Sequence, residues 1–267
     1  MNISISTALA FARSDGQTGF ENLDERIRLI KNAGFNNVTL WWAEEGFEKQ
    51  SDQMKILEKY NVIADNAHLP YSRCNELWMP KGYDETYTND TISDIKECSE
   101  CGINTVVFHV STSKITPVYS EVGLERIKRI VDAAEKYNVK IAFENLRMPK
   151  YLEFITSNID SDKVGICYDS GHNNYCYPAE SIIRKYKDKI FALHLHDNFG
   201  RGDEHLIPFD GNAPWDDITR SISESIYDAI SLEIHKYSSY DSLTREEFLE
   251  KAFIAANKLR EMTLSYK

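Results

Sequence analysis

The chain has 267 residues, of which 42% are hydrophobic and 27% are charged, and its formal net charge is −11. This length is enough for one large α/β domain with a substantial core, and we expect a single domain over residues 1–267. The negative charge disfavours a protein that binds nucleic acid through its overall field, although a local basic patch is compatible with it.

The N-terminal sequence and the cysteines indicate a cytoplasmic protein. Residues 1–16 lack a basic segment followed by a long apolar core, so we expect no signal peptide. No apolar run approaches the roughly 18 residues that a membrane-spanning helix needs. The five cysteines have no framework spacing, which suits a reducing compartment. Cys98 and Cys101 form a lone CxxC pair that we interpret as helix packing.

Short apolar runs alternate with amphipathic segments along the whole chain. Runs of this length, rich in β-branched residues, predict strands that are buried on both faces. The predicted strands are residues 2–6, 37–41, 62–68, 105–109, 139–144, 164–169, 190–194 and 229–233.

Helical periodicity fills the segments between these strands. Leu23, Ile27 and Ile30 have helical spacing, and Gly34 is a plausible C-cap. The last helix opens at Thr244 with Glu247 three residues later, which is a capping-box pattern. The other predicted helices are residues 51–60, 90–101, 124–134, 151–157, 179–186 and 215–223.

Eight strand–helix units without a change in composition favour one fold class, a single α/β domain built as a (β/α)8 TIM barrel. A doubly wound parallel sheet is the alternative. The sequence contains no glycine-rich phosphate loop of the GxGxxG or Walker type.

Six consecutive predicted strands end in an imidazole or a carboxylate. In a barrel the carboxyl ends of the strands share the face that carries the active site, so these side chains would converge. Ionised groups at such depth need a partner or a metal ion. The six residues are His68, His109, Glu144, Asp169, His194 and Glu233.

The densest cluster of such residues is HLHDNFGRGDEH, residues 194–205. It contains three histidines and two aspartates, which is typical of a metal or acid/base site rather than of a solvated loop. Asp203 and His205 are therefore candidates, as is His172, three residues after Asp169. His196 and His235 lie one or two residues beyond a strand end, and we interpret both as supporting or structural.

Each candidate also has a purely structural interpretation. Trp41, Trp42 and Trp78 would wall a pocket in the functional interpretation and simply pack in the structural one. The structural alternatives are ion pairs for Glu144 and Glu233, caps for Asp169 and His172, core histidines for His68 and His109, and a solvated loop for Asp203 and His205.

These motifs resemble the xylose-isomerase-like barrels, a superfamily that includes sugar-phosphate isomerases and epimerases, ketose 3-epimerases and endonuclease IV-type apurinic endonucleases. The resemblance runs from about Asn2 to Ile254. Its carriers are the Phe-Glu-Asn that contains Glu144, the Asp-x-x-His of residues 169–172, the His-x-x-Asp of residues 194–197 and the Leu-Glu that ends at Glu233.

The resemblance implies a cofactor and a set of site residues. It implies a divalent metal ion held by Glu144, Asp169, His194 and Glu233. It also implies that the substrate is contacted by His172 and by Arg201, and we add His68 as a substrate contact. Mixed nitrogen and oxygen ligands suit Mn²⁺, Mg²⁺, Co²⁺ or Zn²⁺.

The endonuclease branch implies further ligands, namely His68, His109, His172, Asp203 and His205, and so more than one ion. The surrounding sequences AHLPYSR, FENLRMPK and CYDSGHNN depart from that branch. Gripping a DNA backbone also needs basic loops, and the scattered candidates are Arg73, Lys81, Arg147, Lys150 and Arg201.

Three hypotheses follow. The first is a sugar or sugar-phosphate isomerase or epimerase, in which Glu144 and Glu233 move a proton next to a carbonyl through an enediolate. The second is a metal-dependent phosphodiesterase acting on abasic DNA. The third is a barrel that binds a sugar without turnover. The expected partner is a small-molecule sugar rather than a membrane or nucleic acid, and dimers are the commonest form of homo-oligomer.

Overall fold

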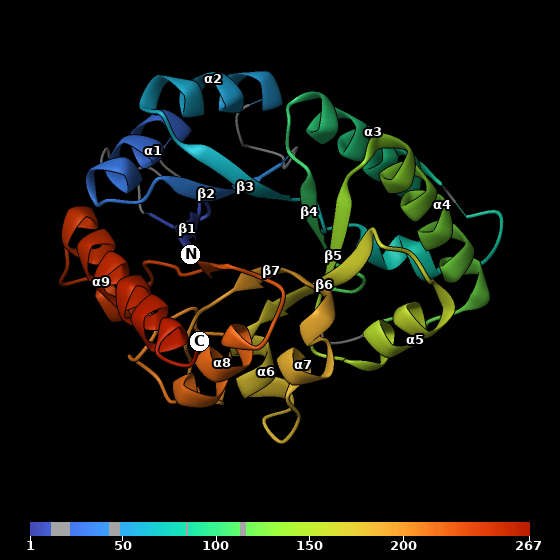
Figure 1. The fold of residues 1–267 in the computed structure, drawn as a ribbon. Coiled ribbons are helices and arrows are strands. Elements are labelled where there is room, and N and C mark those ends of the chain that lie inside the picture. Colours follow the sequence, from blue (N-terminus) through green and yellow to red (C-terminus); the bar gives the residue numbers. More distant parts are fainter. Residues whose placement is uncertain (12–21, 43–48, 84, 113–115) are drawn as a thin grey trace.

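The computed structural model describes residues 1–11, 22–42, 49–83, 85–112 and 116–267. Eight parallel strands follow one another around a barrel in the order β7-β6-β5-β4-β3-β2-β1-β8. The helices form a ring outside them (Figure 1). The strands are β1 Asn2–Ser6, β2 Asn37–Trp41, β3 Ile63–His68, β4 Thr105–Phe108, β5 Lys140–Glu144, β6 Val164–Asp169, β7 Ile190–His194 and β8 Ala229–Leu232.

The last two strands decide between a barrel and an open sheet. β1 pairs with both β2 and β8, so the first and last strands are neighbours. Just beyond β7, Leu195 forms a parallel bridge to Leu232 at the end of β8. The sheet is therefore a nearly closed barrel, the predicted fold class, and the doubly wound alternative is wrong. That residues 1–267 form one domain stays a prediction.

Side-chain caps mark the start of several helices. Asn22 caps α1, Ser120 caps α4, and Thr244 and Glu247 form the predicted capping box of α9. The helices are α1 Leu23–Asn32, α2 Gln50–Tyr60, α3 Thr86–Glu100, α4 Glu121–Tyr137, α5 Lys150–Asn158, α6 Ser170–Cys176, α7 Ile182–Lys185, α8 Trp215–Ser223 and α9 Arg245–Leu264, with 3₁₀ turns at Cys74–Trp78, Lys187–Lys189 and Ser238–Tyr240.

Two helices, α6 and α7, differ from what the sequence predicts. The predicted helix at residues 179–186 is reduced to the single turn of α7, because the Asn173 side chain accepts from Ile182 N and donates to Glu180 O. These side-chain bonds replace helical backbone bonds. Helix α6 was not predicted, and Asp169 caps it by accepting from His172 N at 2.6 Å.

Successive side chains along each strand point to opposite faces of the sheet, and this alternation separates the hydrophobic core from the candidate site. Residues such as Ile5 and Leu40 face the helices in one continuous hydrophobic core. Small residues on the opposite face fill the barrel beneath its carboxyl end, namely Val107, Ala142, Cys167 and Ala192. Each of these four lies two positions before a predicted site residue. The next inward-facing position at the ends of β4, β5, β6 and β7 is therefore occupied by His109, Glu144, Asp169 and His194, respectively.

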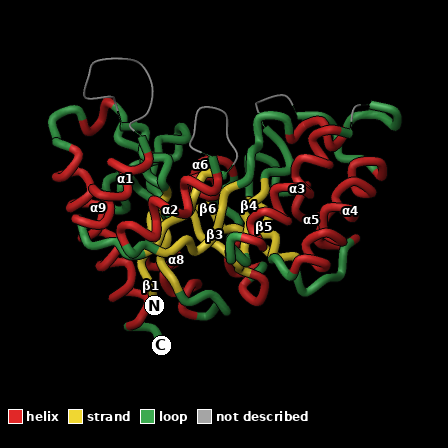
Figure 2. The backbone as a smooth tube through the Cα atoms, turned by 90° about the horizontal axis from the view of Figure 1, so that it is seen from above, coloured by secondary structure: helices red, strands yellow, loops and turns green. Residues whose placement is uncertain are grey.

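Both termini lie at the end of the barrel where β1 begins (Figure 2). The N-terminal amino group lies 3.6 Å from Asp228, and the Lys267 ammonium donates to the same carboxylate at 2.6 Å. Within the described residues, no helix is both long enough and apolar enough to cross a bilayer. The candidate site residues lie at the carboxyl ends of the strands, away from both termini.

Candidate metal centre

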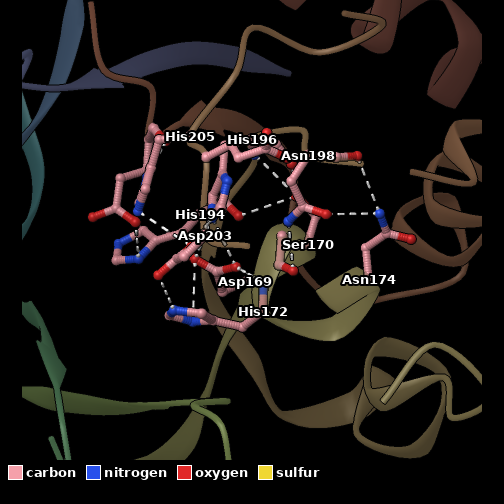
Figure 3. A network of polar contacts seen from close by, with 12 residues as sticks. Asp169, Ser170, His172, Asn174, His194, His196, Asn198, Asp203 and His205 are labelled. Carbon is pink, nitrogen blue, oxygen red and sulfur yellow. Dashed lines mark hydrogen bonds and ion pairs between the residues drawn. The ribbon is translucent and has the colours of Figure 1, made fainter. Parts of the chain in front are cut away.

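Four polar side chains from four neighbouring strand ends meet inside the barrel. They are Glu144 at the end of β5, Asp169 at the end of β6, His194 at the end of β7 and Glu233 just after β8. One ligand atom from each of them lies within 4.8 Å of one from every other, and all four are buried. Figure 3 shows Asp169 and His194 within the surrounding network of polar contacts. We call these four residues the quartet.

His194 lies at the centre of the quartet. Its Nδ1 is 3.1 Å from Glu144 Oε2 and 3.2 Å from Glu233 Oε2. Neither nitrogen of this buried ring makes a hydrogen bond to a protein group in the described part of the chain. Buried polar atoms normally have partners, so a nitrogen that faces two carboxylates without bonding to either fits a set of ligands around a shared cation.

The negative charges of the quartet carboxylates also require a positive charge nearby. Burial by itself would raise the pKa of Glu144 and of Glu233, but the neighbouring imidazoles outweigh it and hold both pKa values well below the usual range. Burial would lower the pKa of His194 and His172, yet the anionic groups around them hold both well above the usual range. Positive charge must therefore balance these carboxylates, and protonated imidazoles or a bound metal ion can supply it.

A second group could hold an ion beside Glu144. His68, His109 and Glu144 each offer a ligand atom within 4.8 Å of the others. The rings of His68 and His109 cross at 71°, so one ion can lie in the planes of both. His68 Nδ1 donates to Leu69 O at 2.9 Å, which leaves Nε2 to face His109 Nε2 at 3.2 Å. A backbone bond of this kind typically fixes the tautomer of a metal-binding histidine.

In a third group, the ligand atoms of His196, His205 and Glu233 also lie within 4.8 Å of one another. The orientation of its two imidazole rings, however, does not suit a shared ion. The rings of His196 and His205 stack 4.0 Å apart at an interplanar angle of 12°. Imidazole lone pairs lie in the ring plane, and two nearly parallel planes at this separation do not meet at one ion. His196 Nε2 instead lies 3.0 Å and 3.1 Å from the two oxygens of Asp169.

His196 thus has a supporting position beside the quartet, in keeping with its interpretation as a supporting or structural residue. It lies two positions after His194, and alternate residues of an extended segment share a face, so the spacing itself was a usable signal. Its contact with both Asp169 oxygens makes it an orienting partner for the quartet. Cys167 also lies near Glu144 and His194, and burial raises the pKa of its thiol to about 12, so without a metal ion the thiol stays protonated.

The remaining candidates form a chain of contacts rather than a ligand group. His172 Nε2 lies 3.1 Å from Asp203 Oδ2, and Asp203 Oδ1 lies 3.5 Å from His205 Nε2. Among the described residues, these three are not one of the groups whose ligand atoms all lie within 4.8 Å. The geometry therefore gives no support to an ion held by these three residues, which the endonuclease branch implies as further ligands.

The loop after β7 carries Asp203 and His205, and one buried carboxylate holds it in place. Asp197 accepts hydrogen bonds of 2.8 to 2.9 Å from Asn198 N, Phe209 N, Ala213 N and the Trp215 indole. Its own backbone pairs in both directions with Leu206. This aspartate is the second half of the His-x-x-Asp motif, and its role is to fix the loop beside the quartet.

The site opens into a cavity of about 220 Å³ at the barrel mouth. Of the quartet, Glu144 and Glu233 line this cavity, while Asp169 and His194 lie behind them. His68, His109, His172, Asp203 and His205 line it as well, together with His235, which stacks 4.2 Å from His205. The two quartet glutamates are thus the ones that face an incoming molecule.

The aromatic and basic lining differs in part from the expected one. Trp41 lines the cavity and stacks on His68 at 4.9 Å, with Tyr71 beside it. Trp42 is fully buried, and Trp78 donates to Val110 O, so neither walls the cavity. Arg201 is exposed and is not among the described lining residues, whereas Arg147 is.

Replacing Asp197 with alanine tests the loop anchor. We expect Asp197→Ala to lower the free energy of unfolding by at least about 2 kcal/mol, because four donors lose a charged acceptor. Urea denaturation measures this, and limited proteolysis should show faster cleavage between residues 198 and 214. The exposed Asp241→Ala is the control, with an expected change within about 0.5 kcal/mol. Equal effects of the two variants would contradict the anchoring role.

Comparison with known proteins places this geometry in context. A family model described as xylose isomerase-like TIM barrel matches residues 27–254. The uncharacterized protein y4fM of Sinorhizobium fredii is 35% identical over 92% of this chain and 91% of its own length. A probable endonuclease 4 of Mycoplasma capricolum is 29% identical over 54% of this chain and 57% of its own.

Solved structures share the fold at low sequence identity. A D-tagatose 3-epimerase-like protein superimposes with a TM-score of 0.74 at 23% identity, covering 100% of this chain and 98% of its own. The IOLI protein, solved with a bound zinc atom, superimposes with a TM-score of 0.72 at 19% identity, covering 100% of this chain and 99% of its own. At these identities the likeness extends to the fold alone.

Proposed function

The chain belongs to the xylose isomerase-like TIM barrel family, and from this premise we propose that it is a metal-dependent enzyme that isomerises or epimerises a sugar next to its carbonyl group. One observation carries the proposal. Glu144 and Glu233 line one cavity from different strands, and both lie within 3.2 Å of the same His194 nitrogen. Two carboxylates so placed are suited to moving a proton to and from one carbon.

The quartet fits a divalent ion, because it offers three carboxylates and an imidazole whose buried nitrogens lack partners. A divalent ion held by Glu144, Asp169, His194 and Glu233 would act as a Lewis acid toward the sugar carbonyl. The ligand set suits Mn²⁺, Mg²⁺, Co²⁺ or Zn²⁺. His196 would orient Asp169 through its contacts with both carboxylate oxygens.

The side chains around the cavity have distinct proposed roles. Both glutamates are ionised at neutral pH, since their pKa values are held low, and an ionised carboxylate is the form that accepts a proton. Glu144 takes the proton next to the carbonyl, and Glu233 returns one, from the opposite face in an epimerisation. His172, which lines the cavity and contacts Glu144 Oε1 at 3.1 Å, stabilises the enediolate oxygen. The names of the epimerase-like structural neighbours support a ketose as substrate.

A second candidate function is supported by the group of His68, His109 and Glu144. Its crossed ring planes suit an ion adjacent to the quartet, and paired ions are a common arrangement for cleaving phosphodiesters. The partial likeness to a probable endonuclease 4 is consistent with this. Against it, the basic residues suggested for DNA contact are scattered, and Arg147 is the one that lines the cavity among those the structure describes.

Solvent exchange tests the base role of Glu144. In deuterium oxide, the wild-type protein should incorporate deuterium next to the carbonyl of an active ketose, and Glu144→Gln should incorporate none. Proton NMR of a panel of ketopentoses and ketohexoses measures this at saturating Mn²⁺. The exposed Glu180→Gln is the matched control and should behave as wild type. Undiminished exchange in Glu144→Gln would eliminate this residue as the base.

Metal content tests the quartet. We expect at least one divalent ion per chain, which a chelator removes, and an ion present at about 100 times its Kd should add about 2.7 kcal/mol to stability. Plasma mass spectrometry and thermal denaturation measure the two quantities. Asp169→Asn should lose most of the metal-dependent rise in melting temperature. A wild-type protein that binds no ion and gains no stability from Mn²⁺, Co²⁺ or Zn²⁺ would exclude the proposed centre.

A duplex with one abasic site separates the two candidate functions. An isomerase or epimerase should leave this duplex intact under conditions in which it exchanges deuterium into a ketose. Denaturing gel electrophoresis detects nicking. Metal-dependent nicking that His109→Ala abolishes, with no exchange into any ketose, would favour the hydrolase instead.

A further inference from the structure

Two arginines follow strands at the mouth of the barrel. Arg147 lies three residues after Glu144 in the loop after β5, and Arg201 lies in the loop after β7. The family resemblance implies Arg201 as the residue that contacts the substrate. The structure instead puts Arg147 in the cavity wall and leaves Arg201 exposed and outside the described lining.

Arg147 is available to bind a ligand. Its Nη2 lies 3.8 Å from Asp203 Oδ2, which is beyond hydrogen-bond distance. Among the described residues, the guanidinium makes this ion-pair contact and no hydrogen bond, and 42% of its side chain is exposed. A guanidinium has five N–H donors in a fixed plane, so it can bind adjacent oxygens of a polyol chain or a carbonyl.

Asp203 also connects Arg147 to the acid/base residues. The same Asp203 oxygen that faces Arg147 lies 3.1 Å from His172 Nε2, and His172 Nδ1 lies 3.1 Å from Glu144 Oε1. The resemblance to the endonuclease branch implies His172, Asp203 and His205 among its further metal ligands. The Arg147 guanidinium puts a permanent positive charge near Asp203.

The charges around the cavity select against an anionic substrate. Glu144, Glu233 and Asp203 bring three carboxylates to its wall, and Arg147 is the one arginine or lysine in the described lining. Carboxylates therefore outnumber arginines and lysines in the described part of the cavity wall. A phosphate dianion would therefore meet three carboxylates and a single guanidinium, whereas the hydroxyls of an uncharged sugar need donors and acceptors alone.

We propose that Arg147 is the specificity-determining arginine of this site, and that it binds the oxygens of an unphosphorylated ketose. The aromatic faces of Trp41 and Tyr71 in the same cavity wall pack against the carbon chain of the sugar. The inference rests on the proposed function for the identity of the substrate. The role of Arg147 in binding is independent of turnover.

Paired arginine variants provide the test. Arg147→Gln should raise KM for the best ketose by roughly tenfold or more, the loss of about one charge-assisted contact, and should change kcat less. Arg147→Lys should recover part of this, since it keeps the charge without the planar fork. Arg201→Gln, the matched control, should stay within about twofold of wild type. Metal content and melting temperature should be unchanged in all three.

A binding measurement without turnover tests the role of Arg147 separately from the proposed function. Calorimetry with xylitol and sorbitol, which have no carbonyl and cannot react, should show weaker binding to Arg147→Gln than to the wild-type protein. If the wild-type protein exchanges deuterium into no ketose but binds these polyols through Arg147, the proposed function fails and the inference stands.

Three results would overturn the inference. The first is a larger effect of Arg201→Gln than of Arg147→Gln on KM or on polyol binding. The second is a clear preference for the phosphate ester of a ketose over the free sugar. The third is the absence of polyol binding to the wild-type protein together with an unchanged KM in Arg147→Gln.

Discussion

Buried negative charge that needs a positive counterpart is the constraint on which this structure depends. Glu144, Asp169 and Glu233 are at most 5% exposed, and each offers a ligand atom within 4.8 Å of the others and of His194. Carboxylates at such depth are costly unless a cation, a proton or a hydrogen-bond donor compensates them. The histidines that approach them meet this need within the chain itself, and the same arrangement is suited to a divalent ion.

The fold satisfies this constraint by keeping apolar packing and polar chemistry on opposite faces of the same strands. Outward-facing residues pack against the helices, and the small residues Val107, Ala142, Cys167 and Ala192 fill the barrel below the quartet. Large side chains at those four positions would leave less room beneath the converging ligands. The buried Asp197 extends this order into the loop after β7, where Asp203 and His205 would otherwise lack a fixed position.

A barrel with a quartet of this kind does not by itself specify a reaction, because function depends on the groups added around it. Here the added groups differ in geometry. The crossed rings of His68 and His109 suit a second ion, whereas the stacked rings of His196 and His205 do not. Arg147 contributes a fixed positive charge beside Asp203. These differences separate an isomerase or epimerase from a hydrolase more sharply than the quartet does.

The sequence by itself determined the barrel, its eight strands to within a residue or so at each end, and the residues at the strand ends, because strand alternation and buried apolar runs are local patterns. It did not determine which arginine faces the cavity, that His196 contacts Asp169, or that Trp42 and Trp78 lie outside the cavity wall. Only the tertiary structure decided these points. The direction of a loop side chain, and the angle between two rings, depend on contacts between residues far apart in the chain, such as those that Asp197 makes with residues 209–215.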